Sequence, residues 1–128
     1  MVLIIIRFRL YDDGLGFRYE FPNQKNLSYF TIAEEITQFN LGKDYTAFWI
    51  RGDYDTNEYN YTTSLLSEVS HQIDAATEEI SAQTPTKEIS VQTPLMLKGN
   101  GVYINIHEAA LKDYPAMLLE LDSTGVIL

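Results

Sequence analysis

Apolar and polar residues alternate along this chain in short runs separated by turn-forming residues, and this pattern constrains its fold most. Residues 2–11 and 15–21 lie on either side of Asp12-Asp13-Gly14, and they alternate in this way, the first segment towards its end. Successive strand residues point to opposite faces of a sheet, so the pattern predicts two strands joined by a hairpin turn. In the first strand we expect an apolar face and a polar face, made of Ile6, Phe8 and Leu10 and of Arg7, Arg9 and Tyr11 respectively.

Further strands are expected along the rest of the chain. Residues 46–50 predict a short buried strand, and residues 57–63 have extended character. The segments 95–98 and 102–107 predict a second hairpin around the turn Gly99-Asn100-Gly101. A last strand is expected over residues 116–121, after a turn at Asp113-Tyr114-Pro115.

The remaining segments have a less regular pattern. Residues 29–39 fit a strand or a short helix, and residues 64–80 carry a helical spacing that strand-forming surroundings could override. The near-repeat at 81–85 and 90–94 predicts two junctions between strand and loop, with prolines where no ladder donor is needed. The fold class is therefore all-β and mainly antiparallel, with at most one short helix.

Size and charge narrow the class of protein. A length of 128 residues is typical of one domain, so residues 1–128 are treated as a single unit. The net charge of −9 argues against nucleic acid and anionic membrane as partners, because both need a cationic surface. No apolar run is long enough to span a membrane, and the opening apolar residues do not have the pattern of a signal peptide. The absence of cysteine excludes disulfides and thiolate chemistry.

No self-contained catalytic motif is present, but two places could carry chemistry. The acidic turn 53–58 has oxygen ligands on alternate residues, yet it lacks the glycine and the final glutamate of a calcium loop, where Ser64 stands. His107 and Glu108 end the predicted strand 102–107 and are followed by Ala109-Ala110. A carboxylate beside an imidazole at a strand end suits a ligand or acid–base position, and equally a hydrogen-bonded pair.

The segment Gly101–Leu111, with Asp113-Tyr114-Pro115 and Met117 behind it, resembles a signature of glycoside hydrolase family 97, a family of bacterial α-glucosidases and α-galactosidases. Three further stretches occur in matching order, so the resemblance covers about residues 5–121. They are Tyr11–Gly14 with Phe17–Pro22, Ala47–Tyr59 around Trp49, and Thr93-Pro94-Leu95.

The resemblance implies a fold and a role. It implies part of a β-supersandwich of the galactose-mutarotase type, an incomplete N-terminal domain of a larger glycosidase whose catalytic barrel is absent here. In calcium-dependent members of the family, the residue that matches Glu108 reaches a calcium ion shared with the barrel. Glu108 is thus the expected metal ligand and, with His107, a contact for an α-linked oligosaccharide. The isolated chain is expected to be inactive, and the family is typically periplasmic.

Several alternatives remain open from the sequence. Trp49 suits sugar stacking or, with more precedent, core packing. A free-standing carbohydrate-binding module would use exposed aromatics such as Tyr54, Tyr59 or Tyr61. A purely structural or subunit-contact module would act through its edge strands, and open sheet edges predict a homo-oligomer.

Overall fold

The computed structural model describes residues 2–78, 89–112 and 114–122, with the side chains of 74–78 excepted. Tertiary contacts divide the chain into two compact units, residues 1–35 and 36–128. Whether the two units fold together as one domain stays a prediction. All strand pairs among the described residues are antiparallel, and one short α-helix accompanies them, so the expected all-β class is confirmed.

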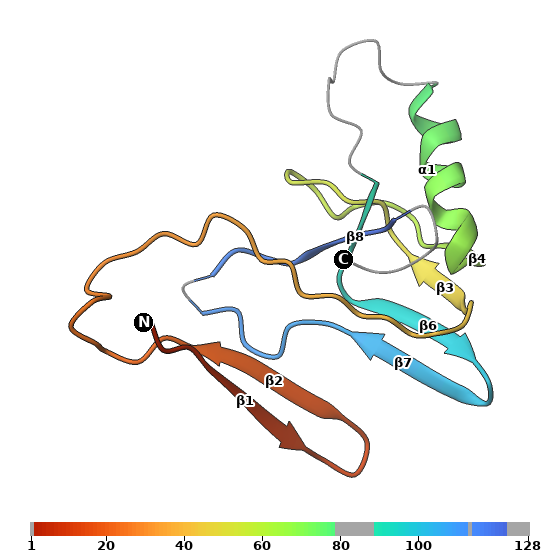
Figure 1. Ribbon diagram of the computed structural model, residues 1–128. Helices are drawn as coiled ribbons and strands as arrows, with labels where there is room; N and C mark the ends of the chain where they lie inside the picture. The colour runs from red at the N-terminus through yellow and green to blue at the C-terminus, as the bar shows by residue number, and fades with distance from the viewer. Residues whose placement is uncertain (1, 79–88, 113, 123–128) are drawn as a thin grey trace. The chain divides into compact units, whose positions relative to one another are not determined.

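The first unit contains the predicted hairpin, with strands β1 (Ile5–Leu10) and β2 (Leu15–Glu20) (Figure 1). Its turn closes through a hydrogen bond that the Tyr11 N–H donates to the Gly14 carbonyl oxygen, with N and O 2.8 Å apart. The register pairs Phe8 with Phe17 across the two strands. The antiparallel pairing, the turn hydrogen bond and a matched apolar pattern therefore define this hairpin locally.

The second unit is built on a four-stranded sheet of order β4-β3-β6-β7 (Figure 1). The strands are β3 (Thr46–Trp49), β4 (Thr62–Leu65), β6 (Leu95–Gly99) and β7 (Val102–Ile106), as the sequence predicts for three of them. The predicted turn joins β6 to β7, with Asn100 at φ 50° and Gly101 at φ 77°. Positive φ at both central residues is the geometry of a two-residue turn that matches strand twist.

A second, two-stranded sheet pairs β5 (Ser90–Gln92) with β8 (Leu118–Glu120). The short helix is α1 (Val69–Glu78), entered through the 3₁₀ turn Leu66–Glu68. Helical spacing therefore prevails over strand-forming surroundings in this segment. The prediction for 29–39 is wrong, since none of the named strands or helices falls there. The first half of the near-repeat and the end of the chain lie outside the described residues.

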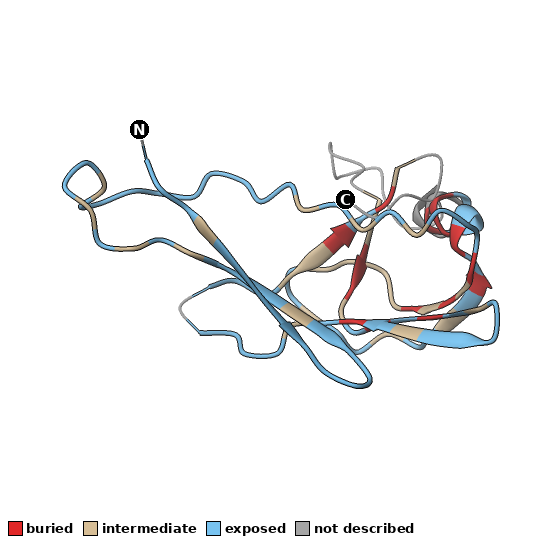
Figure 2. Ribbon diagram, turned by 60° about the horizontal axis from the view of Figure 1, so that its bottom comes forward, coloured by how far each residue is buried: buried red, intermediate tan, exposed pale blue. Residues whose placement is uncertain are grey.

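The hydrophobic core lies entirely in the second unit. One face of the four-stranded sheet contributes Ala47, Trp49, Leu95 and Leu97, and the helix and the small sheet complete the cluster (Figure 2). Its remaining members are Tyr45, Leu66, Val69, Ile73, Val91, Ile106, Leu119 and Leu121. Among residues 2–35, by contrast, none is buried, and Figure 2 draws the hairpin in the colours of exposed and intermediate residues.

Candidate functional site

Strand pairing brings the predicted site residue Glu108 together with two distant segments. Leu95 pairs with Ile106 across β6 and β7, so the residues just before β6 lie beside those just after β7. Gln92 pairs with Leu118 across β5 and β8, so the residue after β5 lies beside the residue before β8. Thr93, Glu108 and Met117 therefore meet at one place, although they span 24 positions of sequence.

The Glu108 carboxylate accepts a hydrogen bond on each oxygen. The Thr93 hydroxyl donates to Oε2 over 2.6 Å, and the Met117 backbone N–H donates to Oε1 over 2.5 Å. The Thr93 oxygen also lies 3.3 Å from the Met117 carbonyl oxygen, a longer contact for its single proton. We call this cluster of Thr93, Glu108 and Met117 the carboxylate clasp.

The clasp holds Glu108 as an anion. Burial raises the pKa of the Glu108 carboxyl, but the bonds from Thr93, from the Met117 N–H and from its own N–H, with the charge of His107, outweigh it and keep the pKa below its ordinary 4.5. A carboxylate offers about four lone pairs, and these three donors use only part of them. The half-buried Glu108 thus combines a fixed orientation with capacity to accept a cation.

His107 lies next to the clasp and is exposed. Its Nδ1 is 2.8 Å from the Glu108 carbonyl oxygen, a contact in which only a protonated Nδ1 can donate. In the neutral ring Nε2 is then the acceptor. The ring is held by the backbone rather than by the Glu108 carboxylate, and its predicted sugar contact stays a prediction.

Trp49 lies in the core and not at the surface. Its side chain is buried, with 5% of the residue exposed, and its indole N–H donates to the Ser64 hydroxyl over 3.1 Å. Stacking on a sugar needs an exposed ring face. The structure therefore places Trp49 in the packing role, against the alternative of a sugar platform.

In the acidic turn 53–58, the carboxylate of Asp53 is bonded within the chain. Asp53 accepts hydrogen bonds from the backbone N–H of Asp55 (2.8 Å) and from the Tyr59 hydroxyl (2.6 Å), which lowers the pKa of the Asp53 carboxyl. Arg51 lies over the Tyr59 ring, 4.2 Å from its centre. Within the described ranges, no group of three or more His, Asp or Glu residues is placed to hold a metal ion.

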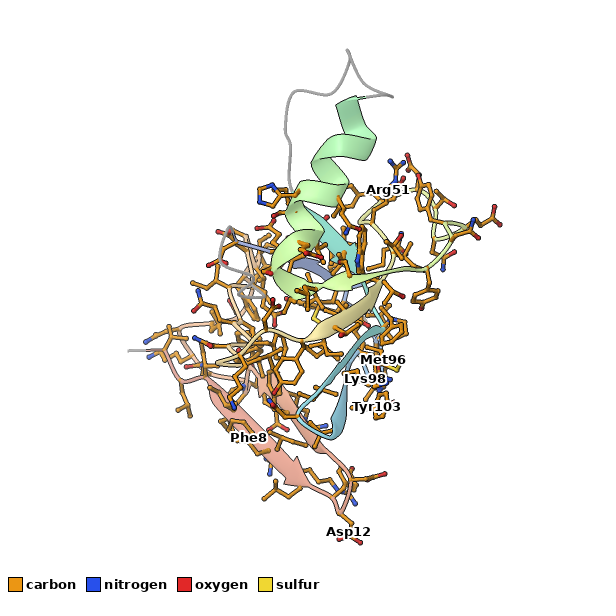
Figure 3. The ribbon with its side chains drawn as sticks, turned by 90° about the vertical axis from the view of Figure 1, so that its right-hand side faces the viewer. Phe8, Asp12, Arg51, Met96, Lys98 and Tyr103 are labelled. Atoms are coloured by element: carbon orange, nitrogen blue, oxygen red, sulfur yellow. The ribbon has the colours of Figure 1, made fainter. Side chains whose placement is uncertain are left out.

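Aromatic side chains reach the surface at other points. Tyr54 and Tyr61 are exposed, whereas Tyr59 is partly covered beneath Arg51. On the outer face of the four-stranded sheet, Tyr103 is 65% exposed and Lys98 lies 5.5 Å from its ring centre (Figure 3). A hollow of about 580 Å³ opens there, and its lining also includes Thr46, Phe48, Val102 and the turn residues 99–101.

Sequence reasoning found Glu108 but missed its partners. The Met117 contact is a backbone N–H, which no residue type signals, and Thr93 is distinguished in the sequence only as part of the stretch Thr93-Pro94-Leu95. Tyr103 belongs to the predicted strand 102–107, and its outward position follows from the period-2 pattern of that strand.

Among the described residues, no helix is long and apolar enough to cross a membrane.

Comparison with known proteins agrees with the motif at Glu108. The family described as glycosyl-hydrolase 97 N-terminal matches residues 3–127. A retaining alpha-galactosidase of Bacteroides thetaiotaomicron is 26% identical over 126 residues, which cover 89% of this chain. The chain spans 16% of the length of that relative. With nearly its whole length matched, the chain belongs to the glycosyl-hydrolase 97 N-terminal family.

Proposed function

We propose that this chain is a non-catalytic segment of an α-glycosidase and supplies Glu108 to a calcium site completed by groups outside the chain. The observation that supports the proposal is the carboxylate clasp: both Glu108 oxygens are oriented by donors, and the carboxyl is anionic. Calcium takes six to eight oxygen ligands, so a single fixed carboxylate completes such a site without forming it. Bound calcium would supply a positive charge beside the substrate.

The substrate class follows from the family. Glycoside hydrolysis needs two carboxylates at a set separation across the sugar. Within the described residues the clasp presents one carboxylate, and its position at the end of β7 suits a supporting role. We infer an α-linked oligosaccharide as the substrate of the complete enzyme, with His107 as a neighbouring contact. A periplasmic location is the corresponding proposal for the compartment.

The experiment is a calcium titration of the complete enzyme. Sequencing the DNA beyond codon 128 far enough to encode a barrel of about 250 residues identifies the protein to express. Glu108→Gln should weaken calcium binding at least tenfold, a loss of the order seen for residues around metal sites. Asp55→Asn, which removes an exposed acid of the turn 53–58, is the matched control and should bind calcium normally.

Two outcomes contradict the proposal. If Glu108→Gln binds calcium as tightly as the wild type, Glu108 is not a ligand. If the reading frame ends after codon 128 and an unrelated gene follows, a hydrolase segment is excluded as the working form of the protein.

A second candidate function is sugar binding by the chain itself. The observation that favours it is the hollow beside Tyr103, where an exposed ring and a neighbouring lysine border an open space. Exposed aromatic rings give large contact area at low entropic cost. Titration with maltotriose should then show binding that Tyr103→Ala abolishes and Tyr54→Ala, at an exposed ring outside the hollow, leaves unchanged.

A further inference from the structure

The strand β5 is hydrogen-bonded along both of its edges. On one edge it pairs with β8. On the other edge the Gly52 N–H donates to the Ser90 carbonyl oxygen over 2.6 Å. The Gln92 N–H donates to the Ile50 carbonyl oxygen over 2.9 Å on the same edge. Residues 50–52, which follow the end of β3, therefore run antiparallel beside β5 and hold its second edge.

The approach of residues 50–52 to β5 is close enough to require a glycine. A Cβ on Gly52 would lie 1.9 Å from the Ser90 hydroxyl oxygen and 2.9 Å from the Ser90 Cβ. The hydroxyl can rotate away, but the Cβ is fixed by the backbone. Any side chain at position 52 would therefore push this segment off β5.

The side chain of Gln92 makes a further bond to the same segment. The residue is buried, with 9% exposed, and its Nε2 donates to the Thr56 carbonyl oxygen over 2.7 Å across 36 positions of sequence. Its backbone N–H bonds to Ile50. Gln92 thus holds both ends of the segment 50–56, and a buried carboxamide bonded in this way resists displacement because a lost partner stays unsatisfied.

The segment 51–59 is bonded internally, so it forms a firm support for Gln92. The Asp53 carboxylate accepts a hydrogen bond from the Thr56 N–H over 3.4 Å and another from the Tyr59 hydroxyl over 2.6 Å. The Tyr59 hydroxyl in turn accepts a bond from Arg51 over 2.5 Å (Figure 3). The acidic turn therefore fixes the very residue whose carbonyl oxygen the side chain from β5 binds.

The carboxylate clasp lies on the step of the β5–β8 ladder that follows the pair Gln92–Leu118. In antiparallel register that step joins Thr93 to Met117. The Glu108 carboxylate takes a donor from each side of it, the Thr93 hydroxyl and the Met117 N–H. Neither donor residue lies within a strand, so the last regular pair of the ladder sets the distance between them.

We propose that Gln92 is a positioning residue for Glu108. Its backbone and side chain fasten the last pair of the β5–β8 ladder to the bonded segment 50–59. That pair then holds the two donors of the clasp at the spacing that one carboxylate spans. The acidic turn, an incomplete calcium loop by sequence, acts on the clasp through Gln92. The importance of this orientation for calcium rests on the proposed function, whereas the orientation itself does not.

The test is hydrogen exchange in the calcium-free chain, followed by nuclear magnetic resonance. The Met117 N–H is bonded to the Glu108 carboxylate, so its exchange reports whether the carboxylate stays in place. The Leu121 N–H donates to the Ile89 carbonyl oxygen over 2.9 Å beyond the other end of the ladder and is the internal reference. Gln92→Met keeps the length of the side chain and removes its donor. It should raise the ratio of Met117 to Leu121 exchange rates about fivefold, the factor for one hydrogen bond.

Two further variants show whether the effect runs through the segment 50–59. Gly52→Ala pushes on the same contact from the other side and should raise the ratio as well. Gly99→Ala crowds Tyr45 in the four-stranded sheet and is the matched control, because it strains the body away from β5 and should leave the ratio unchanged. A wild-type ratio in Gln92→Met overturns the proposal, even where Gly52→Ala fails to fold. An equal rise for Gly99→Ala overturns it too.

Calcium titration of the complete enzyme separates this proposal from the proposed function. If the proposed function holds, Gln92→Met should weaken calcium binding, and by less than Glu108→Gln does. If Glu108→Gln binds calcium normally while Gln92→Met raises the exchange ratio, the calcium role fails and the positioning of Glu108 stands. If Glu108→Gln loses calcium while Gln92→Met changes neither calcium binding nor the ratio, the calcium role stands and the positioning role is overturned.

Discussion

The hairpin of residues 5–20 and the body, residues 36–122, share the same alternation of apolar and polar residues. They differ in how far the apolar side chains are buried. In the body, alternation leaves one apolar face of the sheet buried, and Leu95 and Leu97 have no exposed surface. In the hairpin the alternation is just as regular, yet the apolar side chains are exposed, Leu10 to 81% and Phe8 to 61%. Period-2 patterning thus defines two faces of a strand without stating what covers them. The comparison separates a region ordered by burial from one ordered by local pairing.

Truncating a buried side chain of the body and an exposed one of the hairpin should give the largest difference in loss of stability. Leu97→Ala removes a fully buried side chain from β6 and should lower the free energy of unfolding by about 2–5 kcal/mol. Leu10→Ala removes the same atoms from an exposed position of the hairpin and should change the free energy of unfolding by less than about 0.5 kcal/mol. Urea unfolding followed by circular dichroism at low chain concentration measures both. Equal losses would show that Leu10 is buried in the folded chain.

An alanine in place of a glycine should also destabilise the body more than the hairpin. A Cβ on Gly99 would lie 2.6 Å from Cδ1 of the buried Tyr45 ring, so Gly99→Ala should destabilise the body by about 1–3 kcal/mol through overpacking. Gly14, in the hairpin turn, has no atom within 4 Å of the corresponding position. Gly14→Ala should leave the urea midpoint nearly unchanged. A neutral Gly99→Ala would mean that Tyr45 packs elsewhere.

The carboxylate clasp links the end of β7 to the β5–β8 sheet, and removing its hydroxyl should have an intermediate effect. Thr93→Val leaves Glu108 without one donor and should cost about 1–2 kcal/mol of stability. Thr93→Ser keeps the hydroxyl and should restore most of that loss. If the valine variant is as stable as the wild type and the serine variant is destabilised, the hydroxyl contributes nothing and the methyl group of Thr93 accounts for the effect.

Lowering the pH should give the smallest difference in stability between the hairpin and the body. Glu20 in the hairpin has a pKa lowered to about 2 by hydrogen bonds from Arg7 and Arg18, and the pKa of Glu108 lies below 4.5. A carboxyl with a lowered folded pKa stabilises the fold above its unfolded value, and that contribution is lost as the pH falls through the folded pKa. Both contributions should therefore be complete at pH 6 and fall below pH 4.5.

High salt should distinguish the contribution of Glu20 to stability from that of Glu108. Glu20 is part of an exposed ion-pair cluster, so high salt should screen most of its effect. The hydrogen bonds to Glu108 come from uncharged donors and should persist. Glu20→Gln and Glu108→Gln, compared in urea at low and high salt between pH 6 and pH 3, check this. Loss of the Glu108 effect in salt would assign it to His107 instead of to the clasp.

Local features were predictable from sequence, and contacts between distant segments were not. Both hairpins follow from alternation and turn residues, which act over a few positions. The prediction for residues 29–39 was wrong because a few apolar and acidic residues define a helical face only when a helix is long enough to form. The motif identifies Glu108, but its donors depend on the β5–β8 pairing, which joins positions 26 residues apart at Gln92 and Leu118. The burial of Trp49 likewise depends on Ser64 and the sheet around it.

The buried position of Trp49 also has an optical consequence. It is the single tryptophan of the 128 residues, and it lies in the core with its indole N–H bonded to Ser64. Fluorescence excited selectively in tryptophan therefore reports on the core of the body and should shift to longer wavelength when that core is exposed to water. A transition detected by circular dichroism but not by fluorescence leaves the surroundings of Trp49 folded and belongs to another part of the chain.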